Sequence, residues 1–342
     1  MVSVLALMMI AATAAKEPFE ASWFAKPQRL VDVGGRRMNI FCLGAGSPTV
    51  ILEAGLGLGS PSWALVERPI AQHTRVCAYD RAGMGFSDAT TSARDAQALA
   101  GDLHALLRRA GIAPPYVLVG HSNGGLYTRL YSDRYPQEVA GLVLVDPSTE
   151  YDAQLARRVA PGSQAKSQRE FQSMLRSCAI NIQKCALFPG IDKFNKELKN
   201  EGCPRVQPQA CALNAALAKQ DFSRPSYWND MLLEALAIPK SDAQVQTQQR
   251  PYGDLPLIVL TAGMPDDSSG PITPAQQRAL WAGEKALHDR IASLSSHGAH
   301  FVVAGAGHCI QCDRPFAVVS AVDEIVDEAR QLLRTSPGHL RR

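Results

Sequence analysis

The chain lacks an excess of charge of either sign. Its 342 residues include 35 Lys and Arg against 32 Asp and Glu, which gives a formal net charge of +3. No dense basic run precedes the C-terminal pair Arg341-Arg342. Because proteins that attract nucleic acid carry basic clusters, we expect no nucleic-acid partner.

The N-terminus lacks a hydrophobic run long enough to cross a bilayer. Residues 1–15, MVSVLALMMIAATAA, are uncharged and mostly apolar, whereas a membrane helix needs about 20 such residues. Small residues at Ala12, Ala14 and Ala15 offer a cleavage site, so we interpret residues 1–15 as a signal peptide and expect a periplasmic or secreted protein with no stable membrane span. The positive charge that begins a typical signal peptide is absent, which leaves an uncleaved apolar N-terminus of a cytoplasmic enzyme as the alternative.

Signatures of metal and nucleotide sites are missing too. The chain contains no H-E-x-x-H motif, and the spacing of its Cys and His residues does not suit a zinc site. The glycine-rich stretch YDRAGMGFSD, residues 79–88, lacks the Lys and Ser/Thr that end a P-loop and the spacing of a dinucleotide-binding loop. We therefore predict an activity that needs neither a cofactor nor a metal.

Strand-like and helix-like apolar segments alternate from about Arg29 onward, which predicts an α/β fold. Residues 30–33 and 37–43 flank Gly34-Gly35 in the pattern of a hairpin. Further strands are predicted by the apolar runs TVILEAG, RVCAYD, YVLVGH, GLVLVD, LPLIVLTAG and HFVVAGAGH.

The alternation stops over residues 147–254, which are rich in Gln and show helical patterns without a clear strand. An interruption of this length is too long for a simple connection and is typical of a lid or a small inserted domain. We therefore predict a core formed by residues 16–146 and 255–342, with residues 147–254 as a helical cap.

Apolar side chains in the predicted cap have two interpretations. Some of them roof an apolar acyl pocket, or all of them form the cap's own small core, because apolar residues at helical spacing are usually core. They are Phe171, Met174, Phe188, Phe194, Phe222, Tyr227, Trp228, Met231 and Leu232.

The chain has eight cysteines, and the predicted cap contains Cys178, Cys185, Cys203 and Cys211. Such a cluster fits an oxidising compartment, so we expect these four to form disulfides whose pairing the sequence leaves open. Cys309-Ile310-Gln311-Cys312 has redox-motif spacing but no thioredoxin-like surroundings. A structural pair or two buried thiols is the preferred interpretation of these two.

One serine stands at an unusually crowded turn. The stretch VLVGHSNGGL runs from a strand into a helix, with Gly120 and Gly124 on either side of Ser122. In a G-x-S-x-G nucleophile elbow the tight turn leaves no room for β-carbons beside the serine and lifts its hydroxyl clear of the sheet. Ser122 is therefore the candidate nucleophile.

Several motifs in this order extend the pattern: VILEAGLG, YDRAGMGFSD, VLVGHSNGGL, GLVLVDPS and GAGHCIQCDRP. From about residue 29 to about residue 336, the chain resembles a cap-bearing, esterase-like member of the α/β-hydrolase superfamily. The resemblance implies an eight-stranded, mostly parallel sheet with helices on both faces, a helical cap between the sixth and seventh strands, and a Ser-His-acid triad. It also implies a structural role for the YDRAGMGFSD turn.

A serine nucleophile needs a base, and His308 follows the last predicted strand, where the resembling family places that base. His121 adjoins Ser122 but is expected to line the pocket or to pack. The other histidines are interpreted as surface or packing residues. They are His73, His104, His288, His297, His300 and His339.

The acid of the triad has two candidates, each following a predicted strand. Asp146 ends the strand beside the one that carries Ser122, and Asp266 follows the next strand, where most superfamily members place the acid. We favour Asp146 because relatives with similar VLVGHSxGG and GLVLVD stretches keep an acid there more regularly. Asp266 remains the alternative, and a turn-capping role remains the alternative for Asp146.

An acyl-transfer site also needs two donors for the developing oxyanion, usually backbone N–H groups. Asn123, the residue after the nucleophile, supplies one of them. The other is assigned to Leu56, in the glycine-rich loop after VILEA, although many relatives have His-Gly where this chain has Ala54-Gly55. A simple glycine-rich turn is the alternative there.

These residues predict a serine hydrolase that cleaves a small-molecule carboxylic ester, with an apolar acyl part, through an acyl-enzyme. An amidase, an acyltransferase or a lyase could use the same site, because a fold does not determine its reaction. A non-catalytic binding protein that kept the fold is the alternative of another class. A dehalogenase is disfavoured because it would carry a carboxylate where Ser122 stands.

Overall fold

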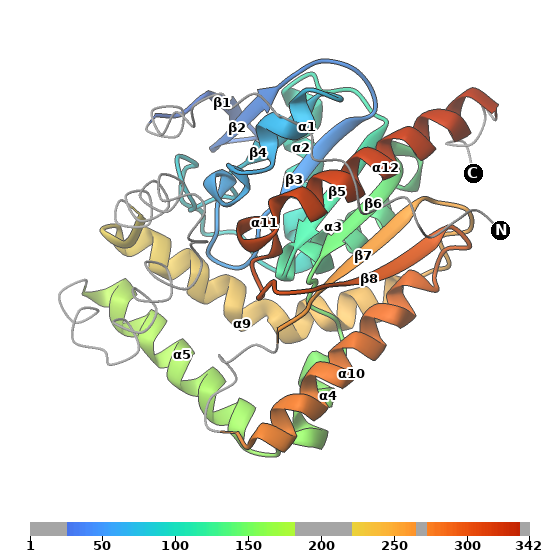
Figure 1. The fold of residues 1–342 in the computed structure, drawn as a ribbon. Helices are drawn as coiled ribbons and strands as arrows, with labels where there is room; N and C mark the ends of the chain where they lie inside the picture. Colours follow the sequence, from blue (N-terminus) through green and yellow to red (C-terminus); the bar gives the residue numbers. More distant parts are fainter. Residues whose placement is uncertain (1–25, 182–220, 265–271, 336–342) are drawn as a thin grey trace.

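Residues 26–181, 221–264 and 272–335 are described by the computed structural model of the chain (Figure 1). They form an eight-stranded sheet in the order β1-β2-β4-β3-β5-β6-β7-β8. Antiparallel pairing is confined to β1 with β2 and β2 with β4, and the pairs from β4 to β8 are parallel. The strands are β1 (Arg29–Asp32), β2 (Arg37–Leu43), β3 (Thr49–Glu53), β4 (Val76–Tyr79), β5 (Tyr116–His121), β6 (Val139–Val145), β7 (Leu257–Ala262) and β8 (Gly298–Val303). This sheet confirms the predicted α/β architecture.

Helices cover both faces of the sheet, and consecutive strand residues pack on opposite faces. In β5, Val117 and Val119 belong to the cluster that contains Ile70 of α1 and much of α12. Leu118 lies in the other cluster, with residues of α2, α3 and α10. Because these central strands are buried on both faces, they appear in the sequence as continuous apolar runs. The helices are α1 (Glu67–Ala71), α2 (Ala96–Arg109), α3 (Asn123–Arg134), α10 (Pro274–Ala292), α11 (Ile310–Asp313) and α12 (Pro315–Thr335), with 3-10 turns at η2 (Ser60–Trp63) and η3 (Pro136–Glu138).

The described part of the segment between β6 and β7 is helical. It contains α4 (Asp152–Val159), α5 (Ser163–Ile180) and α9 (Pro225–Gln248). Figure 1 shows α9 passing between the sheet and α5, and α9 packs on α5, α2 and α3. Helix α9 therefore connects the predicted cap to the core.

Most of the apolar cap residues that the structure describes pack on one another. Met174, Tyr227, Trp228, Met231 and Leu232 are buried in one cluster, and Phe171 and Phe222 pack against it. This cluster extends to Met84 and Leu56 of the core. A core shared by the cap and the sheet domain explains these residues better than a pocket roof does. Phe188 and Phe194 lie outside the described residues.

The cysteines of the described part of the chain are all oxidised, with none left as a free thiol. Cys309 and Cys312 form a disulfide, which agrees with the structural pair expected there. A second disulfide joins Cys42 and Cys77, which face one another across β2 and β4. Cys178 is disulfide-bonded. The other predicted cap cysteines, Cys185, Cys203 and Cys211, lie outside the described residues.

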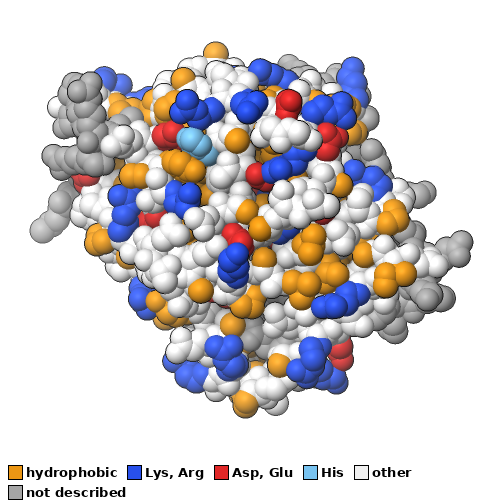
Figure 2. Space-filling model, turned by 180° about the vertical axis from the view of Figure 1, so that it is seen from behind, with side chains coloured by type: hydrophobic (Ala, Val, Ile, Leu, Met, Phe, Trp, Pro, Cys, Tyr) orange, Lys and Arg blue, Asp and Glu red, His pale blue; other side chains and the backbone are white. Residues whose placement is uncertain are grey.

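The surface seen from behind carries dispersed Lys and Arg side chains interspersed with acidic and apolar ones (Figure 2). Among the helices that the structure describes, none combines the length and the apolar character that a membrane span requires. The predicted signal peptide, residues 1–15, lies outside the described residues.

Candidate active site

Ser122 occupies a strained turn between β5 and α3. Its backbone angles are φ 53° and ψ −128°, outside the conformations that most residues adopt. A Cβ built at Gly120 would lie 2.5 Å from the carbonyl oxygen of Gly124, and one at Gly124 would lie 2.4 Å from that of Glu53. Since neither position has room for a side chain, the two glycines permit the turn that presents Ser122.

The loop after β3 lies directly against this turn. A Cβ built at Gly55 would lie 3.2 Å from the Cβ of Ser122 and 3.1 Å from Nδ1 of His121. The described residues supply no hydrogen-bond acceptor for the backbone N–H of Leu56. Asn123 begins α3, where the first N–H groups have no partner within the helix and the helix dipole is positive. Both candidate oxyanion donors therefore belong to segments that flank Ser122.

Asp146 and His308 are brought together at the ends of β6 and β8. Oδ2 of Asp146 lies 2.7 Å from Nδ1 of His308. Two contacts with β7 hold Asp146: its N–H donates to the carbonyl of Leu260 at 2.7 Å, and its Oδ1 accepts from the N–H of Ala262 at 2.9 Å. Burial acts to raise the pKa of Asp146, but the hydrogen bond and charge of His308 and the Ala262 N–H outweigh it, so the pKa lies below its usual value.

The backbone itself marks Ser122 and Asp146. Among the described residues, these two alone are non-glycine residues with positive φ, 53° and 42° respectively. Ser122 follows His121 and Asp146 follows Val145, and His121 and Val145 pair across β5 and β6. The N–H of Ser122 donates to the carbonyl of Val145 at 3.1 Å. Strained non-glycine residues cluster at functional sites because the surrounding structure must hold them there.

The loop that carries His308 is fixed on both sides. Before it, the N–H of Gly307 donates to Oδ2 of Asp313 at 2.8 Å. After it, the Cys309–Cys312 disulfide spans the single turn α11. The His308 side chain is nevertheless 44% exposed, so its ring is accessible while its backbone is held.

His121 packs beneath this loop. Its Nε2 donates to the carbonyl of His308 at 2.9 Å, and the two rings lie 4.7 Å apart between centroids. Burial, with a contribution from nearby His308, lowers the pKa of His121 to about 3. His121 is therefore neutral at pH 7 and packs, one of the two roles expected for it.

Asp266, the alternative acid, lies outside the described residues. Asp146 lies against His308 in the described part of the chain. The residues that the structure describes contain no group of three or more His, Cys, Asp or Glu side chains arranged to hold a metal ion.

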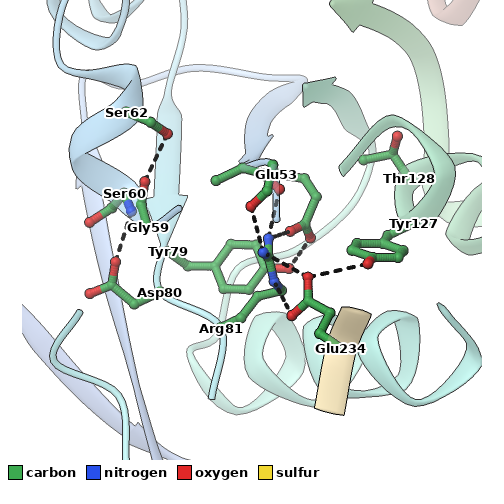
Figure 3. Close-up of polar contacts among 12 residues, drawn as sticks. Glu53, Gly59, Ser60, Ser62, Tyr79, Asp80, Arg81, Tyr127, Thr128 and Glu234 are labelled. Carbon is green, nitrogen blue, oxygen red and sulfur yellow. Dashed lines mark hydrogen bonds and ion pairs between the residues drawn. The ribbon is translucent and has the colours of Figure 1, made fainter. Parts of the chain in front are cut away.

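One polar cluster near the site escaped the sequence reasoning. We call it the Arg81 cluster, and Figure 3 shows part of it around the Arg81 guanidinium. The only sequence signal was that Glu53 and Arg81 follow apolar strands, where neighbouring elements would bury them. The cluster consists of Glu53, Tyr79, Arg81, Arg94, Tyr127 and Glu234.

A second polar group, the His288 chain, runs behind Asp146. His288 Nε2 is bonded to the carbonyl of Pro147 at 2.8 Å, and its Nδ1 to Oγ1 of Thr261 at 2.6 Å. The same hydroxyl meets Nε2 of His300 at 2.6 Å, and Nδ1 of His300 meets Oδ1 of Asp289 at 2.6 Å. His288 and His300 were expected only to pack or to lie at the surface, and no sequence pattern indicated this chain.

Comparisons with known proteins agree with this architecture. A family model described as the alpha/beta hydrolase fold matches residues 48–315. A solved structure of a thermophilic esterase from Thermogutta terrifontis has a TM-score of 0.62 at 20% identity, covering 89% of this chain and 99% of the esterase. At this identity the likeness concerns the fold alone.

Curated relatives match shorter stretches. YbdG of Bacillus subtilis, an uncharacterized protein, is 27% identical over 129 residues, which is 37% of this chain and 40% of YbdG. The chain thus spans less than half the length of that relative. The "Putative carbamate hydrolase RutD" of Azorhizobium caulinodans is 29% identical over 215 residues, 56% of this chain and 80% of RutD. Since the family model covers most of the sequence, the chain belongs to the α/β-hydrolase fold family.

Proposed function

We propose that the protein is a serine hydrolase that cleaves a carboxylic ester of a small molecule through an acyl-enzyme. The observation that carries this proposal is the Asp146–His308 pair beside the strained turn of Ser122. Similarity to a protein named as a carbamate hydrolase supports a hydrolytic reaction at an acyl carbon.

In the proposed mechanism, Ser122 Oγ attacks the ester carbonyl carbon. Because Nδ1 of His308 is bonded to Asp146, Nε2 is assigned the role of accepting the serine proton. The protonated ring then donates that proton to the leaving alcohol, which leaves an acyl-Ser122. Water, activated by the same ring, hydrolyses the acyl-enzyme and regenerates the serine. Asp146 holds the ring's orientation and stabilises its charged form.

Two backbone donors, the N–H groups of Leu56 and Asn123, are assigned the role of stabilising the negative charge that develops on the carbonyl oxygen. The loop of Gly55 lies against Ser122, and Asn123 contributes from the positive end of α3. Removing one such donor in related chemistry costs a factor of about 10²–10³ in kcat. This oxyanion site therefore accounts for a large part of the expected rate.

The proposal is tested by labelling the nucleophile. A serine-directed fluorophosphonate should modify Ser122, as peptide mapping would show, and Ser122→Ala should abolish both the label and the hydrolysis of p-nitrophenyl acetate, a loss of about 10⁴–10⁶ in kcat. Ser132→Ala, on the buried face of α3, is a matched control that should keep both. An unlabelled wild-type protein that leaves p-nitrophenyl esters intact would instead favour the binding-protein alternative.

The match to RutD favours carbamates as a second substrate class, because carbamate cleavage uses the same attack on an acyl carbon. A matched pair of aryl ester and aryl carbamate with one leaving group separates the two classes by their kcat/KM values. Hydrolysis of the carbamate alone would replace the ester proposal while retaining the roles of Ser122 and His308.

An apolar acyl part remains part of the proposal, and its support is narrower. Leu56, which adjoins Gly55, is partly buried and packs against the apolar cluster of the cap. This places an apolar surface next to the turn of Ser122. Hydrolysis of p-nitrophenyl esters from acetate to octanoate should rise with chain length, whereas a flat or falling series would contradict an apolar acyl site.

We further propose that the protein works in an oxidising compartment, as a periplasmic or secreted enzyme. The Cys42–Cys77 and Cys309–Cys312 disulfides support this, because such bonds persist mainly outside the cytosol. Alkylation of free thiols immediately on cell lysis tests it: reduced Cys42 and Cys77 in the natural host would contradict it.

A further inference from the structure

The guanidinium of Arg81 lies between Glu53 of the core and Glu234 of α9 (Figure 3). Its Nη1 donates to Oε1 of Glu53 at 2.7 Å, and its Nη2 donates to Oε1 of Glu234, on α9, at 3.0 Å. Arg94 and Tyr127 hold the same Glu234 carboxylate, at 2.9 and 3.2 Å. The charged side chains are at most 2% exposed.

Stability alone is a weak explanation for such a cluster. Removing charges from water is costly, and well-packed apolar residues often stabilise a fold equally well or better than a buried ion pair. The Arg81 cluster buries two guanidinium groups with two carboxyl groups at the same place. A buried ionic cluster more often specifies one arrangement of its neighbours, so the contacts that it makes beyond its own members are informative.

Arg81 makes two such contacts, and both are with the loop beside Ser122. Nη1 donates to the carbonyl of Ala54, and Nη2 to the carbonyl of Gly55, each at 2.6 Å. The guanidinium thus donates hydrogen bonds to two successive peptide groups. A fixed fork of donors can do this, whereas a single ammonium group cannot reach both carbonyls with the same geometry.

The hydrogen bond to the Gly55 carbonyl determines where the N–H of Leu56 points. The carbonyl of Gly55 and the N–H of Leu56 belong to one peptide group, which is planar and trans. These two bonds therefore point in opposite directions. By holding the Gly55 oxygen, Arg81 directs the Leu56 N–H away from the cluster, and the same loop lies against Ser122.

Helix α9 supports the loop at a second point. The hydroxyl of Tyr227 donates to the carbonyl of Gly57 at 2.7 Å. A Cβ built at Gly57 would lie 2.8 Å from Met231, so α9 also packs closely on the loop. The loop is therefore held both by Arg81, which Glu234 orients, and by α9 directly.

We infer that Arg81, oriented by Glu234 of α9, is a positioning residue that aims the N–H of Leu56 at the oxyanion. The inference rests on the proposed function. It makes α9, a helix of the predicted cap, part of the oxyanion site through its contacts with Arg81 and Gly57. In this role Arg81 acts through the loop, by its hydrogen bonds to Ala54 and Gly55.

Two variants and one control test the inference. Arg81→Lys keeps the positive charge but cannot donate to both loop carbonyls, and Glu234→Gln keeps the shape of the partner but loses its charge. Arg94→Lys is the matched control, because it makes the same exchange in the same cluster and Arg94 has no hydrogen bond to the loop among the described residues. All three are compared after their folded fraction has been measured by thermal unfolding.

Three measurements are made on each variant: kcat and KM for p-nitrophenyl butyrate, the Ki of a trifluoromethyl ketone that forms a tetrahedral adduct, and deuterium exchange in peptides that contain residues 53–58. Arg81→Lys should lower kcat about 10²-fold with KM changed less than about threefold, as expected for a lost oxyanion donor. Its Ki should rise in parallel, and exchange in the loop should accelerate. Glu234→Gln should change all three in the same direction but less, and Arg94→Lys least.

The outcomes separate the two levels of the argument. Faster loop exchange in Arg81→Lys, with kcat and Ki changing in parallel, supports the inference. Unchanged exchange, or a loss of kcat that Arg94→Lys reproduces or that leaves Ki unaltered, overturns it and leaves a structural role for Arg81. If wild-type protein reacts with neither the ester nor the ketone, the proposed function fails, and the exchange data alone still decide whether Arg81 orders the loop.

Discussion

Two buried polar groups flank the turn of Ser122, and they are built from different chemistry. The Arg81 cluster joins the ends of β3 and β4 to α9, while the His288 chain joins β7 and β8 to α10. In the order of the sheet they lie on opposite sides of β5, the strand that ends before Ser122. One stands behind the loop of Leu56 and the other behind Asp146.

The difference between them is charge and access to water. Arginines and carboxylates form the first group, which α9 covers, and guanidinium groups stay charged at any working pH. Imidazoles and a hydroxyl form the second, which ends at Asp289, 53% exposed. Because its guanidinium stays charged at any working pH, Arg81 can hold the loop throughout that range, whereas a chain of imidazoles that reaches the surface can bind and release protons.

The largest expected effect concerns the acid that the His288 chain supports. Asp146→Asn should lower kcat by a factor of about 10⁴, because the amide no longer stabilises the charged ring or holds its tautomer. Asp266→Asn is the matched change at the alternative acid and should alter kcat less than about threefold. If the Asp266 variant loses activity and the Asp146 variant keeps it, the His288 chain supports no catalytic group. The proposed roles of the two polar groups would then be wrong.

The next prediction compares how much the Arg81 cluster and the His288 chain contribute to the free energy of unfolding. Glu234→Ala leaves Arg81 and Arg94 without their shared carboxylate and should lower the free energy of unfolding by about 3–5 kcal/mol. Thr261→Val removes a buried hydroxyl with two hydrogen bonds and should cost about 1–3 kcal/mol. Urea unfolding of both variants measures the difference, and equal losses would contradict the distinction between an ionic and a neutral group.

Sequence reasoning located the parts of this site that local patterns encode. The strands were predicted because buried parallel strands are continuous apolar runs, and Ser122 because Gly120 and Gly124 must flank a tight turn. The same reasoning left Asp146 and Asp266 open, because both follow strands whose ends meet at one edge of the sheet.

Long-range placement explains what was missed. Cys42 and Cys77 are 35 residues apart and pair only because β2 lies beside β4 in one register. Glu234 reaches Arg81 only once α9 packs on the core, and no local pattern records that packing. Buried polar contacts between distant elements are thus the part that a single sequence does not reveal.

A smaller effect is the dependence of stability on pH. Burial lowers the pKa of His288 below its ordinary value, against opposing contributions from Asp146 and the Pro147 carbonyl. As the pH falls below about 6.5, His288 is protonated in the unfolded chain but stays neutral in the folded protein. The free energy of unfolding therefore decreases until the pH reaches the lowered pKa. The slope for one proton is at most about 1.4 kcal/mol per pH unit.

His288→Gln should therefore flatten the loss of stability between about pH 6.5 and the lowered pKa. The part due to His121, whose pKa is about 3, should remain. Tyr127→Phe in the Arg81 cluster is the control: burial raises the pKa of Tyr127 well above 10, so it does not titrate in this range and the slope should not change. Urea unfolding from pH 4.5 to 7.5 measures all three proteins, and an unaltered slope in His288→Gln would contradict the assignment.

The hydrogen bonds of the His288 chain also fix its number of protons. The Pro147 carbonyl and the Asp289 carboxylate only accept, so His288 Nε2 and His300 Nδ1 must both donate. Thr261 has one hydroxyl proton for two ring nitrogens, so the ring to which it does not donate must carry a second proton. Burial disfavours a charge on His288, and the hydrogen bond from His300 lowers the pKa of Asp289 at the other end of the chain.

The smallest expected effect tests this proton. In ¹⁵N NMR one of the two imidazole rings should carry protons on both nitrogens, and Asp289→Asn should change the His300 signals because it removes the anion beside that ring. Stability should change by only about 0.2–1 kcal/mol, since Asp289 is half exposed, and kcat by less than about twofold. Asp327→Asn, which removes the carboxylate beside His73 instead, should leave the His300 signals unchanged. If each of the two rings had one bare nitrogen, one hydrogen bond of the chain would not be formed, which would contradict the proton count.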